Sequence, residues 1–263
     1  MEEDNRSDEK AVLELAMQAG HILLENGAEI FRVEETMDRI CRHYGVQSGS
    51  AFVLSNGIFM TAGDEREHFF AKVQHIPVSG THLDKVAAVN QLSREIAEGK
   101  YTVREAGARI EEIRRMPEKR KSVRILASGV GSAAFCVLFG GSLRDALCAF
   151  AAGVVLYLYI LWVADVYLSK IVGNIIGGTL VTVVSSVFCL LGLGEHLNFM
   201  IIGAIMPLIP GVAFTNAIRD VADGDYISGS VRMLDAMLVF LCIAVGVGIG
   251  ISVLGRITGG ALL

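Results

Sequence analysis

The residues best suited to chemistry lie in one segment, 204–232, where an uncharged hydrophobic stretch leads into alternating charges. Arginine binds a carboxylate through paired hydrogen bonds, and a carboxylate in such surroundings can carry a proton. Arg219 and Asp223 are four residues apart, so they share a face if the helix continues that far. The candidate residues of this charged stretch are Asn216, Arg219, Asp220, Asp223, Asp225, Ser228 and Arg232.

Two helix breakers, Pro207 and Pro210-Gly211, stand just before these charges. Proline inside a membrane helix removes a backbone hydrogen bond, and the freed carbonyls need new partners. Broken helices of this kind line a cavity or a substrate path in many transporters. A salt-bridged helix end is the simpler interpretation of Arg219 or Asp223 alone, but it does not account for the break. The segment therefore predicts a gate or vestibule.

The elements that must position this segment fall into two parts that meet near residue 122. Residues 1–122 contain 17 of the 23 Lys and Arg and 21 of the 28 Asp and Glu. The second part contains five uncharged windows at 125–143, 146–164, 171–194, 197–218 and 236–255, each about the 20 residues that a membrane helix needs. Buried helices of a large soluble protein are the alternative, which five successive windows disfavour. We expect a polytopic α-helical membrane domain of about five spans, 123–263, preceded by an α+β cytosolic domain, 1–122.

Basic residues predict the orientation of the chain. Eight of them precede the first window: Arg104, Arg109, Arg114, Arg115, Lys119, Arg120, Lys121 and Arg124. By the positive-inside rule the N-terminus is cytoplasmic, and the acidic first ten residues lack the apolar core of a secretory signal. The C-terminus is expected outside, unless the broken fourth span is re-entrant.

Periodicity in the first part predicts helices that flank a small antiparallel sheet. Helical spacing covers about 8–26, 29–44, 82–98 and 102–116, and alternation predicts strands at 46–54, 57–62 and 67–76. Glycine after Asn26 and after Tyr44 should end the first two helices. Pro77 is expected to end the third strand and Pro117 to break the last helix.

Chemistry in the first part is sparse. The candidate motif is Gly27, Glu29, Arg32 and Glu34, although carboxylates and arginines at helical spacing are more typical of solvated ion pairs. His68, His75 and His82 do not have metal-ligand spacing, and the five cysteines form no CxxC pair, so we expect reduced thiols. No phosphate loop or nucleophile elbow is present. We expect no cofactor, no metal, no nucleic-acid partner and no enzymatic activity.

Glycine and polar residues also occur inside the expected spans. Small residues spaced four apart, as at Gly173 and Gly177, let helices pack closely, and packing explains most of the glycines. Asn174 is costly to place against lipid, so it should face the interior, either as an interhelical contact or in contact with substrate. Hydroxyls in the same window, from Thr179 to Ser186, more often bond to their own helix.

Two motifs resemble those of the bacterial threonine/serine exporter family: GAEIFRVEETMDRICRHYG at 27–45 and PLIPGVAFTNAIRDVADGDYISGSVR at 207–232. The second is the more specific, and the resemblance covers nearly the whole chain. It implies a multi-pass inner-membrane exporter of small hydrophilic metabolites, surrounded by membrane lipid and driven by the proton gradient or membrane potential. It implies no established catalytic residues.

The number of spans departs from the family's single-chain members, which have about ten. The chain therefore resembles the larger subunit of the split members, which work with a small second membrane subunit of four or five spans. That implies a hetero-oligomer, and a higher oligomer overall. We expect this chain alone to be inactive. Some split members are linked to succinate export, so the cargo is threonine, serine or a dicarboxylate. A membrane-tethered hydrolase and a sensor or scaffold are the alternatives.

Overall fold

The computed structural model describes residues 2–46, 49–63, 68–76 and 80–257, and the chain in it forms two compact units. The first unit consists of Met1–Pro117 and Val212–Leu234, and the second of Glu118–Gly211 and Asp235–Leu263. The chain divides close to the expected boundary at 122, but residues 212–234 group with the N-terminal residues. The segment with the densest charge thus belongs to the first unit, although its sequence neighbours belong to the second.

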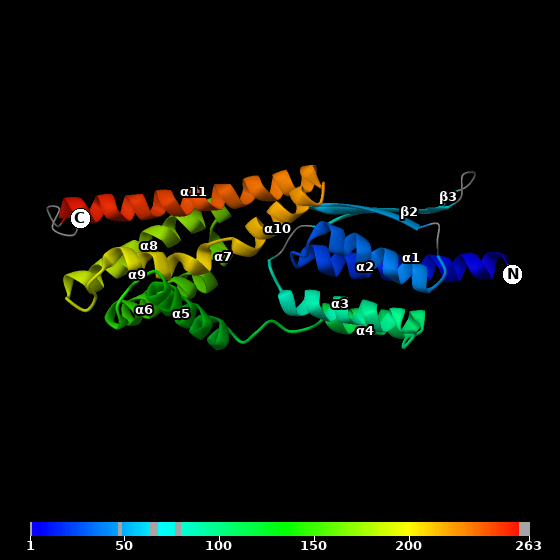
Figure 1. The fold of residues 1–263 in the computed structure, drawn as a ribbon, viewed down its shortest axis with the longest axis horizontal. Coiled ribbons are helices and arrows are strands. Elements are labelled where there is room, and N and C mark those ends of the chain that lie inside the picture. Colours follow the sequence, from blue (N-terminus) through cyan, green and yellow to red (C-terminus); the bar gives the residue numbers. More distant parts are fainter. Residues whose placement is uncertain (1, 47–48, 64–67, 77–79, 258–263) are drawn as a thin grey trace. The chain divides into compact units, whose positions relative to one another are not determined.

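The first unit has three layers in its N-terminal part (Figure 1). Helices α1 (Glu2–Glu25) and α2 (Ile30–His43) lie between a three-stranded sheet on one side and helices α3 (Leu83–Ala97) and α4 (Val103–Arg114) on the other. These bounds confirm every helix and strand expected before residue 117. A mixed layer order of this kind buries one face of the sheet and most of the middle helices.

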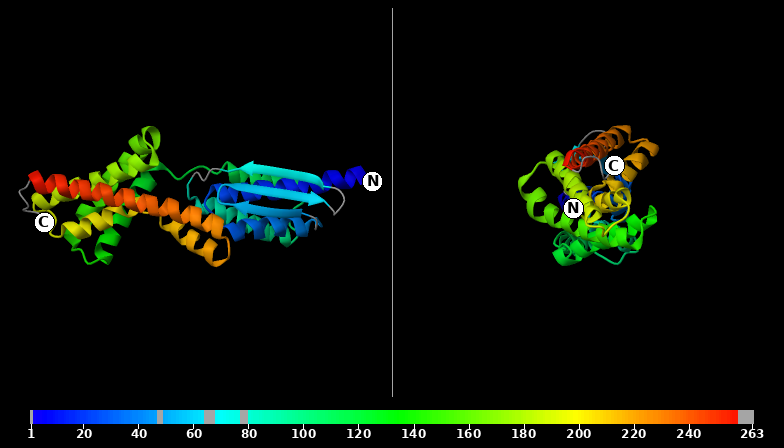
Figure 2. Two further views of the ribbon diagram at one scale, coloured as in Figure 1. Left: turned by 90° about the horizontal axis from the view of Figure 1, so that it is seen from above. Right: turned by 90° about the vertical axis from the view of Figure 1, so that its left-hand side faces the viewer.

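The sheet is antiparallel in the order β1 (Gly49–Leu54), β2 (Gly57–Gly63), β3 (His68–His75). The left view of Figure 2 shows neighbouring arrows that point in opposite directions. In the register, Phe52 faces Phe59 and Phe59 faces Val73, and these three side chains are exposed on one face. Val53 and Ile58 alternate with them and are buried on the other face, as strand geometry requires.

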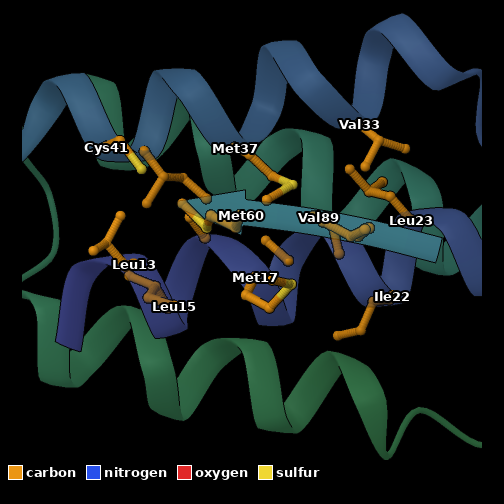
Figure 3. Close-up of a cluster of buried hydrophobic side chains, with 14 of the residues drawn as sticks. Leu13, Leu15, Met17, Ile22, Leu23, Val33, Met37, Cys41, Met60 and Val89 are labelled. Carbon is orange, nitrogen blue, oxygen red and sulfur yellow. The ribbon is translucent and has the colours of Figure 1, made fainter. Parts of the chain in front are cut away.

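The core of this unit is built around α1. Leu13, Met17 and Leu23 are fully buried, and Met37 from α2 and Met60 from β2 lie in the same cluster (Figure 3). Because α1 lies in the middle layer, its buried residues extend around the helix and are not confined to the single apolar stripe of a surface helix.

Glycines end the first two helices as the sequence predicts. Gly27 and Gly45 adopt φ angles of 80° and 81°, and the helices before them end at Glu25 and His43. Side chains other than glycine rarely adopt this left-handed conformation. The tight turn at Gly27 brings the chain directly from α1 into the start of α2.

The remaining part of the first unit is a helical hairpin, residues 212–234, formed by α10 (Gly211–Ala222) and the start of α11 (Tyr226–Ile257). Gly224 makes the turn with a φ of 97°. At Gly229 an added Cβ would lie 2.9 Å from the Val221 nitrogen and 3.0 Å from the Ala217 oxygen. The two helices therefore pack at backbone distance, which only glycine permits here.

The second unit is helical in its described residues. Its elements are α5 (Lys121–Leu138), α6 (Leu143–Tyr159), a π-helical turn (Ile160–Ala164), α7 (Asp165–Tyr167), α8 (Lys170–Leu190), α9 (Leu197–Ile205), a 3-10 turn (Met206–Leu208) and the rest of α11. Four helices of the described chain are long and apolar enough to cross a membrane, and the bent pair α9–α10 makes up to five. That range includes the expected five spans.

Close packing explains most glycines of this unit, as expected. A Cβ on Gly246 would lie 2.1 Å from the Ile175 carbonyl oxygen, and one on Gly178 would lie 2.8 Å from that of Ile243. Thr182 and Ser186 donate hydrogen bonds to carbonyls of their own helix. These hydroxyls are therefore satisfied within α8.

The expected break in the fourth window is present. Helix α9 ends at Ile205, Pro207 lies in the 3-10 turn, and α10 begins at Gly211, directly after Pro210. Proline cannot donate the backbone hydrogen bond that would continue α9. The window thus forms two helices that are joined by a 3-10 turn and two further residues and bent by 66°.

Candidate functional site: a polar junction of two distant motifs

Two motifs that lie about 190 residues apart in sequence meet inside the first unit. The loop between α1 and α2 contacts the α10–α11 hairpin through a set of hydrogen bonds and ion pairs. We call this set the polar junction; it consists of Gly27, Ala28, Glu29, Ile30, Asn216, Arg219, Asp220 and Arg232. Six of these eight residues are candidates from the sequence.

Asp220 is the most deeply buried charge of the polar junction, with no exposed side-chain surface. Its Oδ1 accepts a hydrogen bond from the Ile30 N–H at 3.1 Å, and its Oδ2 accepts one from Arg232 Nη1 at 2.9 Å. Ile30 is the first residue of α2, and the preceding Glu29 makes no side-chain cap for that helix. A carboxylate on α10 therefore caps α2, where a negative charge is favourable.

Glu29 forms the second ion-pair group of the junction. Its buried carboxylate binds Arg219 of the hairpin and Arg32 of its own helix. Burial raises the pKa of Glu29, but hydrogen bonds from the two arginines outweigh it and hold the pKa below its ordinary value. Glu29 therefore remains ionised at neutral pH and keeps both guanidinium groups in place.

Two side chains of the hairpin bind backbone carbonyls of the α1–α2 loop. Asn216 Nδ2 donates to the Gly27 oxygen at 2.8 Å, and Arg232 Nη1 donates to the Ala28 oxygen at 3.1 Å. These carbonyls follow the end of α1, where helix geometry leaves carbonyls without intrahelical partners. The hairpin thus satisfies polar groups that the loop cannot satisfy itself.

Three further carboxylates, Glu34, Asp223 and Asp225, lie at the edge of the junction. Burial raises the pKa of Glu34, the Val53 N–H that donates to its carboxylate lowers it in part, and the charge of Asp225 raises it again. Asp225 is half-buried in the turn between α10 and α11, and Asp223 beside it is exposed. Neither aspartate side chain has an ion-pair partner within the described ranges.

The other predicted site residues lie elsewhere. Ser228 is buried in the hairpin, whereas Pro207, Pro210 and Gly211 form the break before α10 in the second unit. Asn174 is half-exposed, and its Nδ2 donates to the Lys170 oxygen one turn earlier in α8. The amide thus has a partner in its own helix, and the expected interhelical or substrate contact of Asn174 stays a prediction.

The structure gives Arg219 a partner that its spacing from Asp223 does not predict. Arg219 pairs with Glu29, since its long side chain reaches the carboxylate of the loop and does not bond Asp223 one turn along. In α2 the expected surface ion pairs are confirmed for Arg39–Glu35 and Arg42–Asp38. The exception is Glu29, which is buried by the hairpin.

Sequence reasoning missed Ala28 and Ile30, which take part through backbone atoms. Their types carry no chemical signal, and the Ile30 N–H resembles any other amide in the sequence. The available signal was indirect: Glu29 opens α2 without a capping side chain of its own, which leaves the helix start in need of an acceptor.

The geometry can now be set beside known proteins. Residues 14–254 match the family model for threonine/serine exporters, ThrE. The chain belongs to this family. Both motifs that form the polar junction fall inside the matched range, as do the candidate spans, except for the last three residues of α11.

Three relatives illustrate the match. YjjP of Klebsiella aerogenes, described as a probable succinate transporter subunit, is 24% identical over 95% of this chain and 97% of that protein. YjjP of Escherichia coli, with the same description, is 23% identical over 94% of this chain and 96% of that protein. The threonine/serine exporter of Corynebacterium glutamicum is 24% identical over 94% of this chain but only 52% of that protein. The chain thus spans about half of this relative. No solved structure matches the chain.

Proposed function

We propose that this chain is one subunit of a secondary active exporter of small carboxylate-bearing metabolites, such as threonine, serine or a dicarboxylate. The buried Asp220–Arg232 pair, held against the α1–α2 loop, is the observation that carries the proposal. Buried charges are costly, and in transporters they commonly mark the path of a substrate or ion. Family membership supports transport as the reaction. The buried Asp220–Arg232 pair supports this position for part of the substrate path.

The location and partner form part of the same proposal. The first ten residues are rich in acids and basic residues crowd the start of α5, which supports a cytoplasmic N-terminus in a bacterial inner membrane. The relative that the chain matches over nearly its full length is described as a subunit, and the single-chain relative is about twice as long. A second membrane subunit of four or five spans would supply the missing half.

The path residues extend beyond the polar junction. We assign the break at Pro207, Pro210 and Gly211 to the membrane part of the path, since the two prolines have no N–H to continue α9 and broken helices of this kind line substrate paths in transporters. Asn174 remains a candidate for that part. Asp223, Asp225 and Ser228 are candidates at the hairpin turn, together with Arg32 and Glu34 on α2.

An efflux experiment tests the proposal. Cells that lack this chain and its partner are loaded with a threonine-containing dipeptide or with succinate, and the two subunits are restored together. We expect efflux of at least one of these compounds to depend on the restored pair. Equal efflux with and without the pair, for each compound, would refute the exporter assignment.

Pro210→Ala tests the role of the break. A continuous helix would still cross the bilayer, so we expect normal amounts of protein in the membrane and reduced efflux. Normal efflux at normal expression would remove the break from the path.

A further inference from the structure

The carboxylate of Asp220 accepts hydrogen bonds from a backbone N–H at a helix start and from an arginine. Proteins use both kinds of donor to bind free carboxylates. The Ile30 N–H stands at the start of the 14-residue helix α2, and Arg232 supplies a guanidinium group. A helix N-terminus and an arginine fork both favour an anion in this position. The chain itself currently provides that anion.

Arg232 has donor capacity that the chain does not use. Its Nη1 binds Asp220 and the Ala28 carbonyl, but its Nη2 is buried and has no hydrogen-bond partner among the described residues. The whole side chain is only 11% exposed. A buried donor without a partner is unfavourable, and a carboxylate bound by both Nη atoms would relieve this. Asp220 contacts Nη1 alone.

We propose that Asp220 occupies a carboxylate-binding seat, formed by the Ile30 N–H and Arg232, which a carboxylate of the cargo takes over during transport. The inference rests on the proposed function and adds its recognition step. Asp220 and the cargo are then competitors for the same donors. Arg232 faces one carboxylate before and after the exchange, so its charge stays balanced. The incoming carboxylate also gains the hydrogen bond from Nη2.

The electrostatic surroundings make the exchange reversible. The negative charge of Asp225 repels that of Asp220 and attracts Arg232, and Glu29 also attracts Arg232. These negative charges oppose a tightly held extra anion, so a cargo carboxylate can leave again. Release is as necessary for transport as binding.

Binding measurements on the full chain with its partner subunit, purified in detergent, test the seat. Succinate and threonine are titrated separately by calorimetry. Asp220→Asn keeps an oxygen for the Ile30 N–H but removes the competing charge, so we expect at least one compound to bind about tenfold more tightly, as the loss of one charge-assisted hydrogen bond implies. Arg232→Gln should abolish binding.

The matched control is Asp38→Asn, which makes the same chemical change in an exposed pair with Arg42 on α2. It should leave the affinity unchanged. Unchanged or weaker binding in Asp220→Asn, with wild-type helicity by circular dichroism, would overturn the seat, and so would an equal gain in Asp38→Asn. If the wild type exports the compound but Asp220→Asn does not bind it more tightly, the seat is refuted and the exporter assignment stands. Absence of both efflux and binding refutes the exporter assignment as well.

Discussion

Burial decides what each carboxylate of the polar junction contributes. Glu29 directly precedes α2 and Glu34 lies in its first turns, yet their pKa values move in opposite directions. Glu29 is buried with two arginines, whereas Glu34 is partly buried with one backbone N–H and the negative charge of Asp225. The difference comes from the partners and not from the residue type: Arg32 and Arg219 for Glu29, and the Val53 N–H and Asp225 for Glu34.

The two glutamates should respond oppositely to amide substitution. At neutral pH we expect Glu29→Gln to lower the thermal midpoint of the detergent-solubilised full chain and Glu34→Gln to leave it equal or raise it. A lowered pKa means that ionised Glu29 stabilises the fold above its ordinary pKa of 4.5, and that this stabilisation is lost as the pH falls through the lowered value. A raised pKa means that ionised Glu34 destabilises the fold until acid protonates it.

Glu34→Gln should therefore reach wild-type stability by the time the pH has fallen to about 4.5, whereas Glu29→Gln should approach it only below that pH. Melting curves from pH 7 to pH 3 check this. A deficit in Glu29→Gln that is constant across this range would mean that the carboxylate acts by shape and not by charge.

The Asp220–Arg232 pair allows stability to be separated from transport. Arg232→Met leaves a buried carboxylate without its cation and should cost about 3–5 kcal/mol. In Arg232→Met/Asp220→Asn the charge is gone and the Ile30 N–H keeps an acceptor, so most of the stability should return while export stays lost. Thermal unfolding and efflux measure the two effects. Export restored in the double variant would make the pair a purely structural contact.

At the scale of elements, the α10–α11 hairpin depends on the absence of a side chain at Gly229. A Cβ there would meet backbone atoms of α10 at 3.0 Å or less. Gly229→Ala should therefore push the helices apart, shift Arg232 from Asp220 and reduce efflux. The outcome is measured as lowered thermal stability and faster amide exchange at Ile30, whose N–H depends on Asp220.

Gly248→Ala on the same helix is the matched control, because nothing lies within 4 Å of a Cβ at that position. It should be neutral or slightly stabilising, since alanine favours a helix. Equal effects of the two substitutions would mean that helix propensity, and not the close approach at Gly229, controls the hairpin.

Local patterns placed these elements well. The helices and strands up to residue 117 follow from apolar spacing and from glycine at 27 and 45, because both signals act within a few residues. The break after α9 also follows locally from Pro207 and Pro210. The burial of α1 on nearly every side does not follow from local patterns, because it depends on layers that come from the rest of the unit.

At the scale of the whole molecule, transport should require a second chain. The threonine/serine exporter of Corynebacterium glutamicum is matched over only 52% of its own length, which leaves room in that protein for a further part of similar size. We expect no efflux from cells that express this chain alone and efflux when the second subunit is co-expressed. Expression of each chain is verified in membranes by immunoblot. Full efflux with this chain alone would show that it assembles a path by itself.

The sequence by itself determined the family, the helices and the residues from which a site is built. Patterns of hydropathy, proline, glycine and charge act locally, so a single chain displays them. Only the tertiary structure decided that Glu29 pairs with Arg219, that Asp220 caps α2, and that Arg232 keeps an unused donor. These contacts join residues about 190 positions apart, and no local pattern fixes such a pairing. The cost of leaving one buried charge without its partner favours this pairing, and the charges are buried only after the hairpin packs on the loop.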